Sequence, residues 1–383
     1  MKRYLVLFFY EMMEPVFLYK DIGSIALSLS KYYGWQVTFA YLDIRGEIKD
    51  NLYQKYVNLT PIHYEKNRLK KWKNIITFIW KNSKNYDVLN FYFGGREELF
   101  LALITKIRNP NIKVYVKMDL VKEKYIRQIN LSKNLSVKIL QALSNILTSV
   151  IDLYTVECRT YIFGLNKIKR FRNKVKYLPN GFFDDLVEVD KDIKKEKIFL
   201  TVGRLGTPEK NTEMFIEAIE NIEPEKLKDW KIYLVGSMTD EFFEWFSNKL
   251  KSKPYLKNYI IITGNINNKK ELYTLYAKSS VFVLSSRWES WGLVVTEAMS
   301  FGCYSIITDC CDAFREIFDY GENGFCKLIK NEDKFSMQKA IEEVLDSNVC
   351  YLKKGRKAKI FVENNLKWKQ IVYNLNDYLF NIL

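Results

Sequence analysis

The fold of this chain is decided by one stretch, Ser285-Ser286-Arg287-Trp288-Glu289-Ser290-Trp291-Gly292-Leu293-Val294-Val295-Thr296-Glu297-Ala298-Met299. The apolar run before it, Val281-Phe282-Val283-Leu284, predicts a buried strand. The polar turn that follows predicts the start of a helix around Gly292. Glu289 lies in this turn, and we expect Glu297 about two turns inside the helix, at about 1.5 Å of rise per residue.

This strand, turn and helix predict a site for a ligand that carries both phosphate and hydroxyl groups. The unpaired amides and the positive dipole end of a helix N-terminus bind anions. The carboxylates of Glu289 and Glu297, with seven residues between them, accept hydrogen bonds from hydroxyls. A nucleotide sugar has both kinds of group. The alternative is an ordinary amphipathic helix with a solvated Glu297.

A second motif, Phe199-Leu200-Thr201-Val202-Gly203-Arg204-Leu205 followed by Lys210, has the features of a phosphate site. Glycine at position 203 lets the backbone approach a ligand closely. Arg204 offers a bidentate fork to phosphate oxygens, and Lys210 adds a point charge. These cations would neutralise a diphosphate without a metal. Solvated surface cations are the alternative.

Alternating strands and helices predict an α/β protein with parallel sheets covered on both faces. The turn Leu178–Phe182 and the charged connector Asp184–Glu196 divide the chain, so we expect domains at 1–182 and 183–367. Strands are expected at Tyr4–Phe9, Val37–Tyr41, Val88–Phe93, Val114–Lys117, Tyr154–Val156, Lys176–Leu178, Lys197–Val202, Lys231–Val235, Tyr259–Ile262, Val281–Leu284 and Ser305–Thr308.

The two motifs together resemble the donor-binding signature of family-4 retaining glycosyltransferases, also called group 1 glycosyltransferases. The match lies in Glu-x7-Glu set within Glu-Ser-Trp-Gly-Leu and Glu-Ala-Met, and it covers Tyr177 to the end better than the first half. The resemblance implies the GT-B fold, in which two Rossmann-like domains face each other across a cleft. It implies an acceptor-binding N-terminal domain, a donor-binding C-terminal domain, and a helix at 368–383 that packs back on the first domain.

The resemblance also implies roles for individual residues. Glu289 would face the transferred sugar, while Arg204 and Lys210 would hold the diphosphate and stabilise the leaving group; these three are the predicted catalytic residues. Transfer with retention, a UDP-sugar in preference to a GDP-sugar, and no metal or other cofactor are expected. The predicted donor-binding residues are Gly203, Gly264, Asn265, Ser290, Trp291, Gly292, Leu293 and Glu297.

The N-terminal half departs from the family pattern. Its first strand leads into Tyr10–Pro15, where many relatives have a glycine-rich loop. Many relatives also carry a histidine before an aspartate at the end of an N-terminal strand, where this chain has Lys117 and Asp119. Either residue is a candidate for the acceptor side, although Asp119 is equally consistent with a helix cap. Arg96 is a third candidate, suited to a lipid-linked diphosphate or simply an arginine in a loop.

The chain has 383 residues, a net charge of +15 and 15% aromatic residues, as expected for a basic globular protein of two domains. No nucleic-acid-binding motif accompanies the charge. The segment Lys66–Lys84 mixes lysines with Trp, Phe and Ile, as does a helix on an anionic membrane surface, although a normal surface helix fits equally well. Without a signal peptide or a run of about 18 apolar residues, we expect a cytoplasmic protein and hypothesise peripheral attachment to the inner face of the membrane.

The cysteine and histidine content makes a zinc site unexpected. The chain has six cysteines outside paired CxxC spacings and one histidine, His63, to which we assign a structural role. The thiols are expected to be reduced and mostly buried.

The expected function is that of a retaining, metal-independent hexosyltransferase that moves a sugar from a nucleotide-diphosphate donor to a glycan or lipid-linked sugar acceptor. Cell-surface polysaccharide or glycoconjugate synthesis is the expected setting. The alternatives are a non-catalytic GT-B partner protein and a nucleotide-sugar epimerase of related fold. A dehydrogenase is disfavoured because Gly203-Arg204-Leu205-Gly206 is no Gly-x-Gly-x-x-Gly motif.

Overall fold

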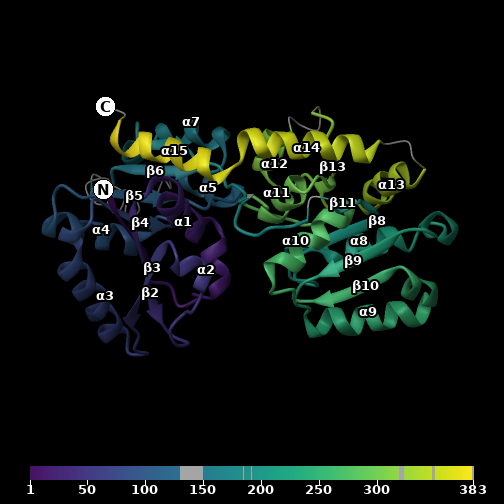
Figure 1. The fold of residues 1–383 in the computed structure, drawn as a ribbon, viewed down its shortest axis with the longest axis horizontal. Helices are drawn as coiled ribbons and strands as arrows, with labels where there is room; N and C mark the ends of the chain where they lie inside the picture. Colours follow the sequence, from purple (N-terminus) through teal and green to yellow (C-terminus); the bar gives the residue numbers. More distant parts are fainter. Residues whose placement is uncertain (130–149, 184, 191, 319–322, 347–349, 382–383) are drawn as a thin grey trace. The chain divides into compact units, whose positions relative to one another are not determined.

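A computed structural model of the chain contains two compact α/β units, each built on a parallel sheet (Figure 1). It describes every residue except 130–149, 184, 191, 319–322, 347–349 and 382–383. One unit comprises Met1–Asn180 together with Trp368–Leu383, and the other comprises Gly181–Lys367. The division falls two residues before the expected boundary between 182 and 183. We call these the N-terminal and the C-terminal unit.

In the N-terminal unit, the described strands form a seven-stranded sheet in the order β3-β2-β1-β4-β5-β6-β7. Every neighbouring pair is parallel, and the order reverses between β1 and β4. β4 is buried along its whole length because helices cover a parallel sheet on both faces. The strands are β1 (Arg3–Phe8), β2 (Gln36–Asp43), β3 (Val57–His63), β4 (Val88–Tyr92), β5 (Lys113–Lys117), β6 (Leu153–Val156) and β7 (Val175–Tyr177).

The helices of this unit connect its strands, and the last of them comes from the far end of the chain. That helix packs against the first: the Tyr33 hydroxyl donates to the Lys369 carbonyl over 3.0 Å, and the rings of Trp35 and Phe380 lie 5.8 Å apart. The described α-helices are α1 (Asp21–Tyr33), α2 (Asn51–Gln54), α3 (Arg68–Asn82), α4 (Arg96–Arg108), α5 (Lys122–Ile129), α7 (Arg159–Asn166) and α15 (Trp368–Phe380).

The C-terminal unit has a six-stranded parallel sheet in the order β10-β9-β8-β11-β12-β13 among its described residues. Here the order reverses between β8 and β11, and β11 is buried throughout. The strands are β8 (Glu196–Val202), β9 (Lys231–Val235), β10 (Ile260–Gly264), β11 (Ser279–Leu284), β12 (Tyr304–Thr308) and β13 (Cys326–Ile329). The α-helices are α8 (Thr212–Ile219), α9 (Asp240–Ser252), α10 (Lys269–Lys278), α11 (Leu293–Ser300), α12 (Asp312–Phe318), α13 (Lys334–Leu345) and α14 (Tyr351–Asn365).

Two edge strands were not expected from the sequence. β3 contains Pro61 and alternates between exposed and buried positions, and β13 has only four residues. Proline is tolerated on an edge strand because one side of that strand needs no hydrogen-bond donor. His63 ends β3 with its side chain 78% exposed.

The cysteine prediction is confirmed. None of the six forms a disulfide, and Cys158, Cys303, Cys311 and Cys326 are buried. Within the part of the chain that the structure describes, no helix is long and apolar enough to cross a bilayer.

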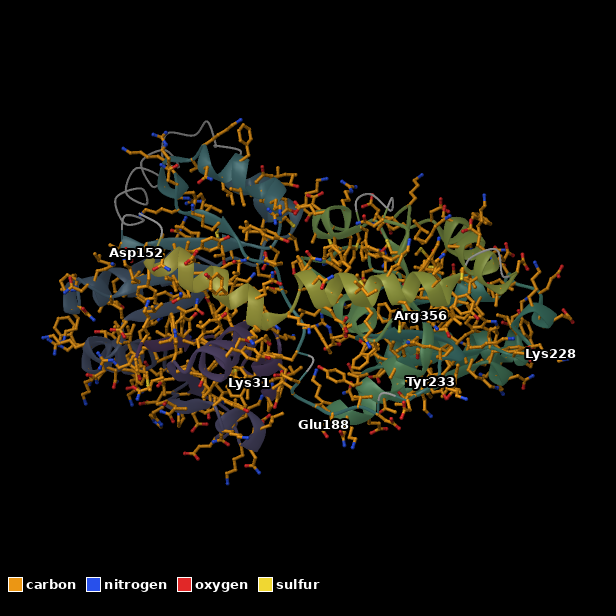
Figure 2. All side chains as sticks on the ribbon, turned by 45° about the horizontal axis from the view of Figure 1, so that its top comes forward. Lys31, Asp152, Glu188, Lys228, Tyr233 and Arg356 are labelled. Carbon is orange, nitrogen blue, oxygen red and sulfur yellow. The ribbon has the colours of Figure 1, made fainter. Side chains whose placement is uncertain are left out.

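In helix α14, Gly355 packs directly against the backbone of Gly302. A Cβ added to Gly355 would lie 2.1 Å from the carbonyl oxygen of Gly302. The neighbouring Arg356 is exposed, and its side chain is labelled in Figure 2. The close packing of α14 therefore requires glycine at position 355.

We expect Gly355→Ala to destabilise the protein by about 1–3 kcal/mol because the obstructing atom belongs to the backbone and cannot rotate away. This cost exceeds the gain of up to about 1 kcal/mol that alanine brings inside a helix. Thermal unfolding followed by circular dichroism measures the effect, with Arg356→Ala as the matched surface control. An unchanged or raised Tm for Gly355→Ala would contradict the packing argument.

Candidate functional site

The turn between β11 and α11 ends at Gly292, which is the N-cap of the helix, and α11 begins at Leu293. Gly292 has a φ of 72°, and an added Cβ would lie 2.6 Å from Cζ of Phe314, so only glycine fits here. Glu297 is the fifth residue of the helix, a little over one turn from its start, because each turn takes 3.6 residues. The expected distance of two turns was wrong.

Glu289 in this turn is paired with Lys210 from the loop between β8 and α8. Lys210 Nζ lies 2.5 Å from Glu289 Oε1, and the Ser286 hydroxyl donates to the same oxygen over 2.8 Å. Both side chains of the pair are more than four-fifths buried. A second bond, from the Ser285 hydroxyl to the Lys210 carbonyl over 3.0 Å, holds the two loops together. The structure thus joins two predicted catalytic residues that are 79 positions apart.

Arg204 belongs to the same edge of the sheet. Its guanidinium is 68% exposed and forms an ion pair with Glu209. Gly203 lies beside the lysine, because a Cβ built on it would be 3.6 Å from Cδ of Lys210. The exposed arginine and the lysine both follow the carboxyl end of β8, so two cations lie at this edge of the sheet.

Arg287 connects the loops around this cation pair. Its amide donates to the Glu209 carbonyl over 2.8 Å, Nη1 donates to the Pro208 carbonyl over 2.6 Å, and Nε donates to Glu332 over 2.7 Å. Sequence reasoning missed Arg287 and Glu209. Arg287 lies inside the first quoted motif and Glu209 directly precedes Lys210, but only the folded chain shows which groups they contact.

The ends of β8, β9 and β10 approach one another through glycines. A Cβ on Gly236 would lie 1.8 Å from the carbonyl oxygen of Gly203, and the Gly236 amide donates to the Gly264 carbonyl over 2.9 Å. Asn265 follows β10 and is exposed. This part of the edge therefore presents backbone groups, as ligand sites at the carboxyl ends of parallel strands do.

Glu297 has partners of its own on α10. The Tyr276 hydroxyl donates to Oε2 over 3.1 Å, and Lys269 Nζ lies 3.5 Å from Oε1. Tyr276 is fully buried, and burial together with Glu297 raises its pKa well above the usual value, so the hydroxyl remains a donor. Sequence reasoning missed Tyr276 and Lys269 because α10 carries no part of the signature.

The remaining predicted donor residues lie in the turn itself. The Trp291 ring is buried, and its Nε1 donates to the Thr296 hydroxyl over 3.0 Å. This ring anchors the turn to α11, which leaves the backbone as the part of Trp291 available to a ligand. Ser290 and Leu293 are half-buried.

The predicted acceptor-side residues are placed differently from one another. Arg96 is exposed at the first position of α4, and Asp119 is half-buried after β5. Lys117 is completely buried, with Nζ 2.5 Å from Glu157 Oε1 and 3.4 Å from the Leu178 carbonyl. The structure therefore places the Lys117 ammonium inside the N-terminal unit and not on its surface.

The Lys117–Glu157 pair is surrounded by an excess of carboxylates. Burial raises the pKa of Asp21, at the start of α1, to about 6, against the lowering effect of Lys117. The charge of Asp119 raises it further. Burial likewise raises the pKa of Glu157 above its usual range, although Lys117 opposes this. The cluster can hold a proton close to neutral pH.

We expect Asp21→Asn to flatten the dependence of stability on pH. The pKa of Asp21 is about 6 in the folded protein and about 3.9 in an unfolded chain. The folded state therefore binds more protons than the unfolded state in this window, and stability falls as the pH rises from about 4 to 6. The measurement is Tm between pH 4 and 8, and the variant should gain stability over the wild type as the pH rises.

The matched control is Glu47→Gln, an exposed residue of the same unit that should follow the wild-type profile. If Asp21→Asn and the wild type gave parallel Tm profiles, the raised pKa of Asp21 would be contradicted.

Comparison with known proteins agrees with the fold of the two units. The two units, each a Rossmann-like parallel sheet with helices on its faces, are those of the GT-B fold. Residues 184–368, almost all of them in the C-terminal unit, match the family model described as glycosyl transferases group 1.

Curated relatives cover part of the chain. An uncharacterized glycosyltransferase from Haemophilus influenzae is 26% identical over 172 residues, which are 44% of this chain and 45% of that protein. The mannosylfructose-phosphate synthase of Agrobacterium fabrum is 22% identical, over 71% of this chain and 64% of its own length. The chain therefore spans less than two thirds of either relative.

A solved structure extends the likeness to the whole chain. The Anabaena protein Alr3699/HepE in complex with UDP aligns over 100% of both chains, with a TM-score of 0.74 and 14% identity. At this identity the likeness concerns the fold.

Proposed function

We propose that this protein is a retaining glycosyltransferase that takes a sugar from a nucleotide-diphosphate donor, without a metal ion, and transfers it to a glycan or lipid-linked acceptor. The observation that carries the proposal is the contact of Lys210 with Glu289 beside the first turn of α11. We infer that this contact brings a cation and a carboxylate close to the amides that open α11, so that a ligand at the sheet edge could meet all of them.

The chemistry follows from the charges of these groups. A bound diphosphate would attract Lys210 and the exposed Arg204, and it would accept hydrogen bonds from the amides that open α11. Lys210 would then exchange its contact with Glu289 for one with a phosphate oxygen. The freed Glu289 carboxylate would accept hydrogen bonds from hydroxyls of the transferred sugar. Glu297, held by Tyr276, would accept them from the ribose.

In this mechanism the protein contributes orientation and charge stabilisation. The bond from the anomeric carbon to the diphosphate breaks while the acceptor oxygen attacks the same face, and the departing phosphate oxygen takes the acceptor's proton. Lys210 and Arg204 stabilise the negative charge that develops on the diphosphate. We favour UDP as the nucleotide because the structurally similar HepE was solved with UDP and with UDP-glucose.

The two alternatives fit the site less well. Epimerases of related fold, by our expectation, use several acids and histidines, whereas His63 is exposed at the end of an edge strand. A non-catalytic partner protein would have no need for the paired Lys210 and Glu289. The intact set of charged groups favours an enzyme.

The first test is a thermal-shift series with UDP, GDP and ADP in the presence of EDTA. A ligand at 100 times its Kd stabilises the folded protein by about 2.7 kcal/mol, so a bound nucleotide gives a clear rise in Tm. We expect the largest rise with UDP. No rise with any of the three would contradict the donor site.

Glu289→Ala separates binding from catalysis. We expect it to retain the nucleotide-induced rise in Tm and to lose sugar transfer by a factor on the order of 10² or more, because Glu289 faces the transferred sugar. Glu244→Ala, on the exposed face of α9, is the control and should transfer normally. Full transfer activity in Glu289→Ala would overturn its assignment.

We also propose that the N-terminal unit docks on an anionic membrane through helices α3 and α4. Four large apolar side chains on these adjacent helices are exposed, with relative exposures of 81% for Leu69, 47% for Trp80, 48% for Phe100 and 63% for Ile107. The Arg108 guanidinium lies 5.3 Å from the Trp80 ring centroid. Helix α3 contains no acidic residue. Exposed apolar groups among lysines are what an anionic bilayer surface attracts.

Vesicle flotation tests the docking surface. The triple variant Lys70→Gln, Lys73→Gln, Lys81→Gln should lose binding to phosphatidylserine-containing vesicles, because each basic residue near such a surface contributes about 1 kcal/mol. A control with the same change of charge is Lys353→Gln, Arg356→Gln, Lys357→Gln on α14. Equal flotation of the two triple variants, or no flotation of the wild type, would contradict the proposal.

A further inference from the structure

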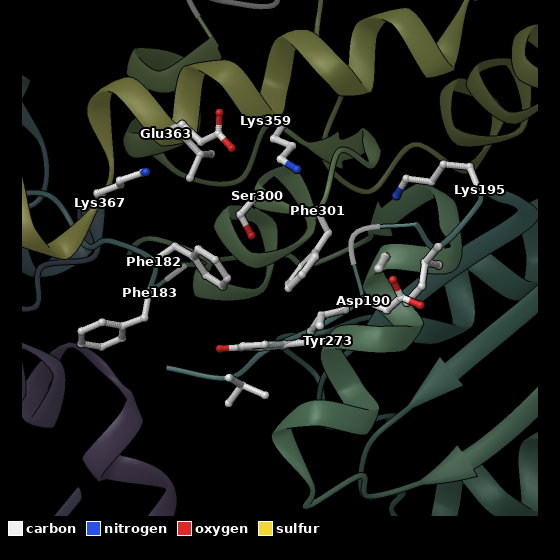
Figure 3. A pocket seen from close by; sticks show the side chains of 15 residues that line it. Phe182, Phe183, Asp190, Lys195, Tyr273, Ser300, Phe301, Lys359, Glu363 and Lys367 are labelled. Atoms are coloured by element: carbon white, nitrogen blue, oxygen red, sulfur yellow. The ribbon is translucent and has the colours of Figure 1, made fainter. Parts of the chain in front are cut away.

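The C-terminal unit contains a cavity of about 430 Å³ that none of the predicted donor residues lines (Figure 3). It lies between residues 187–190 and 193–195 of the connector and the helices α10, α11 and α14. On α11 it meets the C-terminal end, at Ser300 and Phe301, whereas the donor site surrounds the opposite end of that helix. Its volume falls in the range of about 300–1,000 Å³ that is typical of small-molecule sites.

One wall of the cavity is aromatic. The ring centroids of Phe182 and Tyr273 lie 5.6 Å apart, those of Phe182 and Phe301 also 5.6 Å, and those of Tyr273 and Phe301 5.1 Å. The three rings come from the turn before the connector, from α10 and from the residue that caps the C-terminus of α11, and together they form a continuous surface. Such a surface packs against the apolar C–H face of a ligand.

The other walls carry charges of both signs. Lys359 and Glu363 lie four residues apart on α14 and therefore on the same side of the helix, and Asp190 lies on the connector. The Ser300 hydroxyl donates to the Glu297 carbonyl over 2.6 Å, which leaves its oxygen as an acceptor. Lys195 is committed elsewhere, since its Nζ donates to the Ser279 carbonyl over 2.5 Å and to the Tyr276 carbonyl over 3.1 Å.

These walls select the chemistry of the ligand. An anion would meet the carboxylates of Asp190 and Glu363. Both carboxylates and the Lys359 ammonium are exposed, so they are open to hydroxyl groups of a ligand, which a purely apolar compound does not offer. One oxygen of Asp190 already accepts from the Asp192 amide over 2.9 Å. A polyhydroxyl compound satisfies both kinds of group, because each hydroxyl can donate to a carboxylate or accept from an ammonium. Its C–H face would cover the rings. We propose that this cavity is a second carbohydrate-binding site, which takes an uncharged mono- or disaccharide.

The proposal does not depend on the proposed transferase activity, because the cavity and the donor site use different residues. Binding is therefore measured directly, by saturation-transfer NMR with glucose, galactose, mannose, N-acetylglucosamine and their common disaccharides, in the presence of excess UDP. Each sugar is titrated against wild type and variants. Inorganic phosphate is titrated as the anionic competitor.

The test variant combines Lys359→Ala with Glu363→Ala. The matched control combines Lys357→Ala with Asn364→Ala, which replace two exposed residues of the same helix that do not line the cavity. Phe301 is left unchanged because its ring also stacks on Tyr276, the partner of Glu297. At least one sugar should bind the wild type and the control equally, and the test variant at least tenfold more weakly. The test variant should keep the rise in Tm with UDP, if the wild type shows one.

Three results would overturn the proposal. They are the absence of binding by every sugar, equal binding to the test variant, and displacement of the sugar by inorganic phosphate at low concentration. A missing Tm rise with UDP in the wild type would instead count against the donor site alone.

Discussion

The parallel pairing of β8 with β11 is the constraint on which the candidate site depends. Phe199 and Leu200 lie beside Val281 and Phe282 in register, although about 80 residues separate the strands along the chain. Because both strands point the same way, the loops at their carboxyl ends emerge side by side. That placement alone brings Lys210 to within 2.5 Å of Glu289.

The same pairing explains why glycines gather at this edge. Loops that leave neighbouring parallel strands compete for space, and the Gly203 carbonyl occupies the position that a side chain at 236 would need. Arg287 then holds the loops through two backbone carbonyls of the neighbouring loop and the carboxylate of Glu332. The cations and carboxylates of the site are therefore positioned by backbone packing, which preorganises them at little cost in side-chain entropy.

The N-terminal unit uses charge differently. Lys117 and Glu157 are buried together at the carboxyl ends of β5 and β6, where desolvation opposes both charges. Removing either partner would leave an uncompensated buried charge. A substitution at position 117 or 157 alone would therefore be unfavourable. Burial raises the pKa of the nearby Asp21, and the charge of Asp119 raises it further, while Lys117 lowers it.

Much of the fold was predictable because its strands are buried on both faces. Continuous apolar runs such as those of β4 and β11 mark a central strand of a parallel sheet regardless of what surrounds it. The edge strands β3 and β13 were not predicted. Strand β3 contains a proline and partly exposed residues, and β13 has only four residues, so neither shows the continuous apolar pattern of a central strand. The helix α11 begins directly after Gly292, as predicted, but Glu297 lies only a little over one turn inside it, because five positions of a helix with 3.6 residues per turn fall short of two turns.

The sequence by itself determined the alternation of strands and helices, the glycines at the strand ends, and the choice of Glu289, Arg204 and Lys210 as a chemical set. Only the tertiary structure decided the partners: Glu289 with Lys210, and Glu297 with Tyr276. It also determined that the Lys117 ammonium is buried. The physical reason is that a local sequence pattern depends only on the burial and backbone conformation of its own residues. Contacts between distant segments depend on the order of the strands in the sheet. In both sheets this order reverses at one point, and no single segment of sequence indicates where.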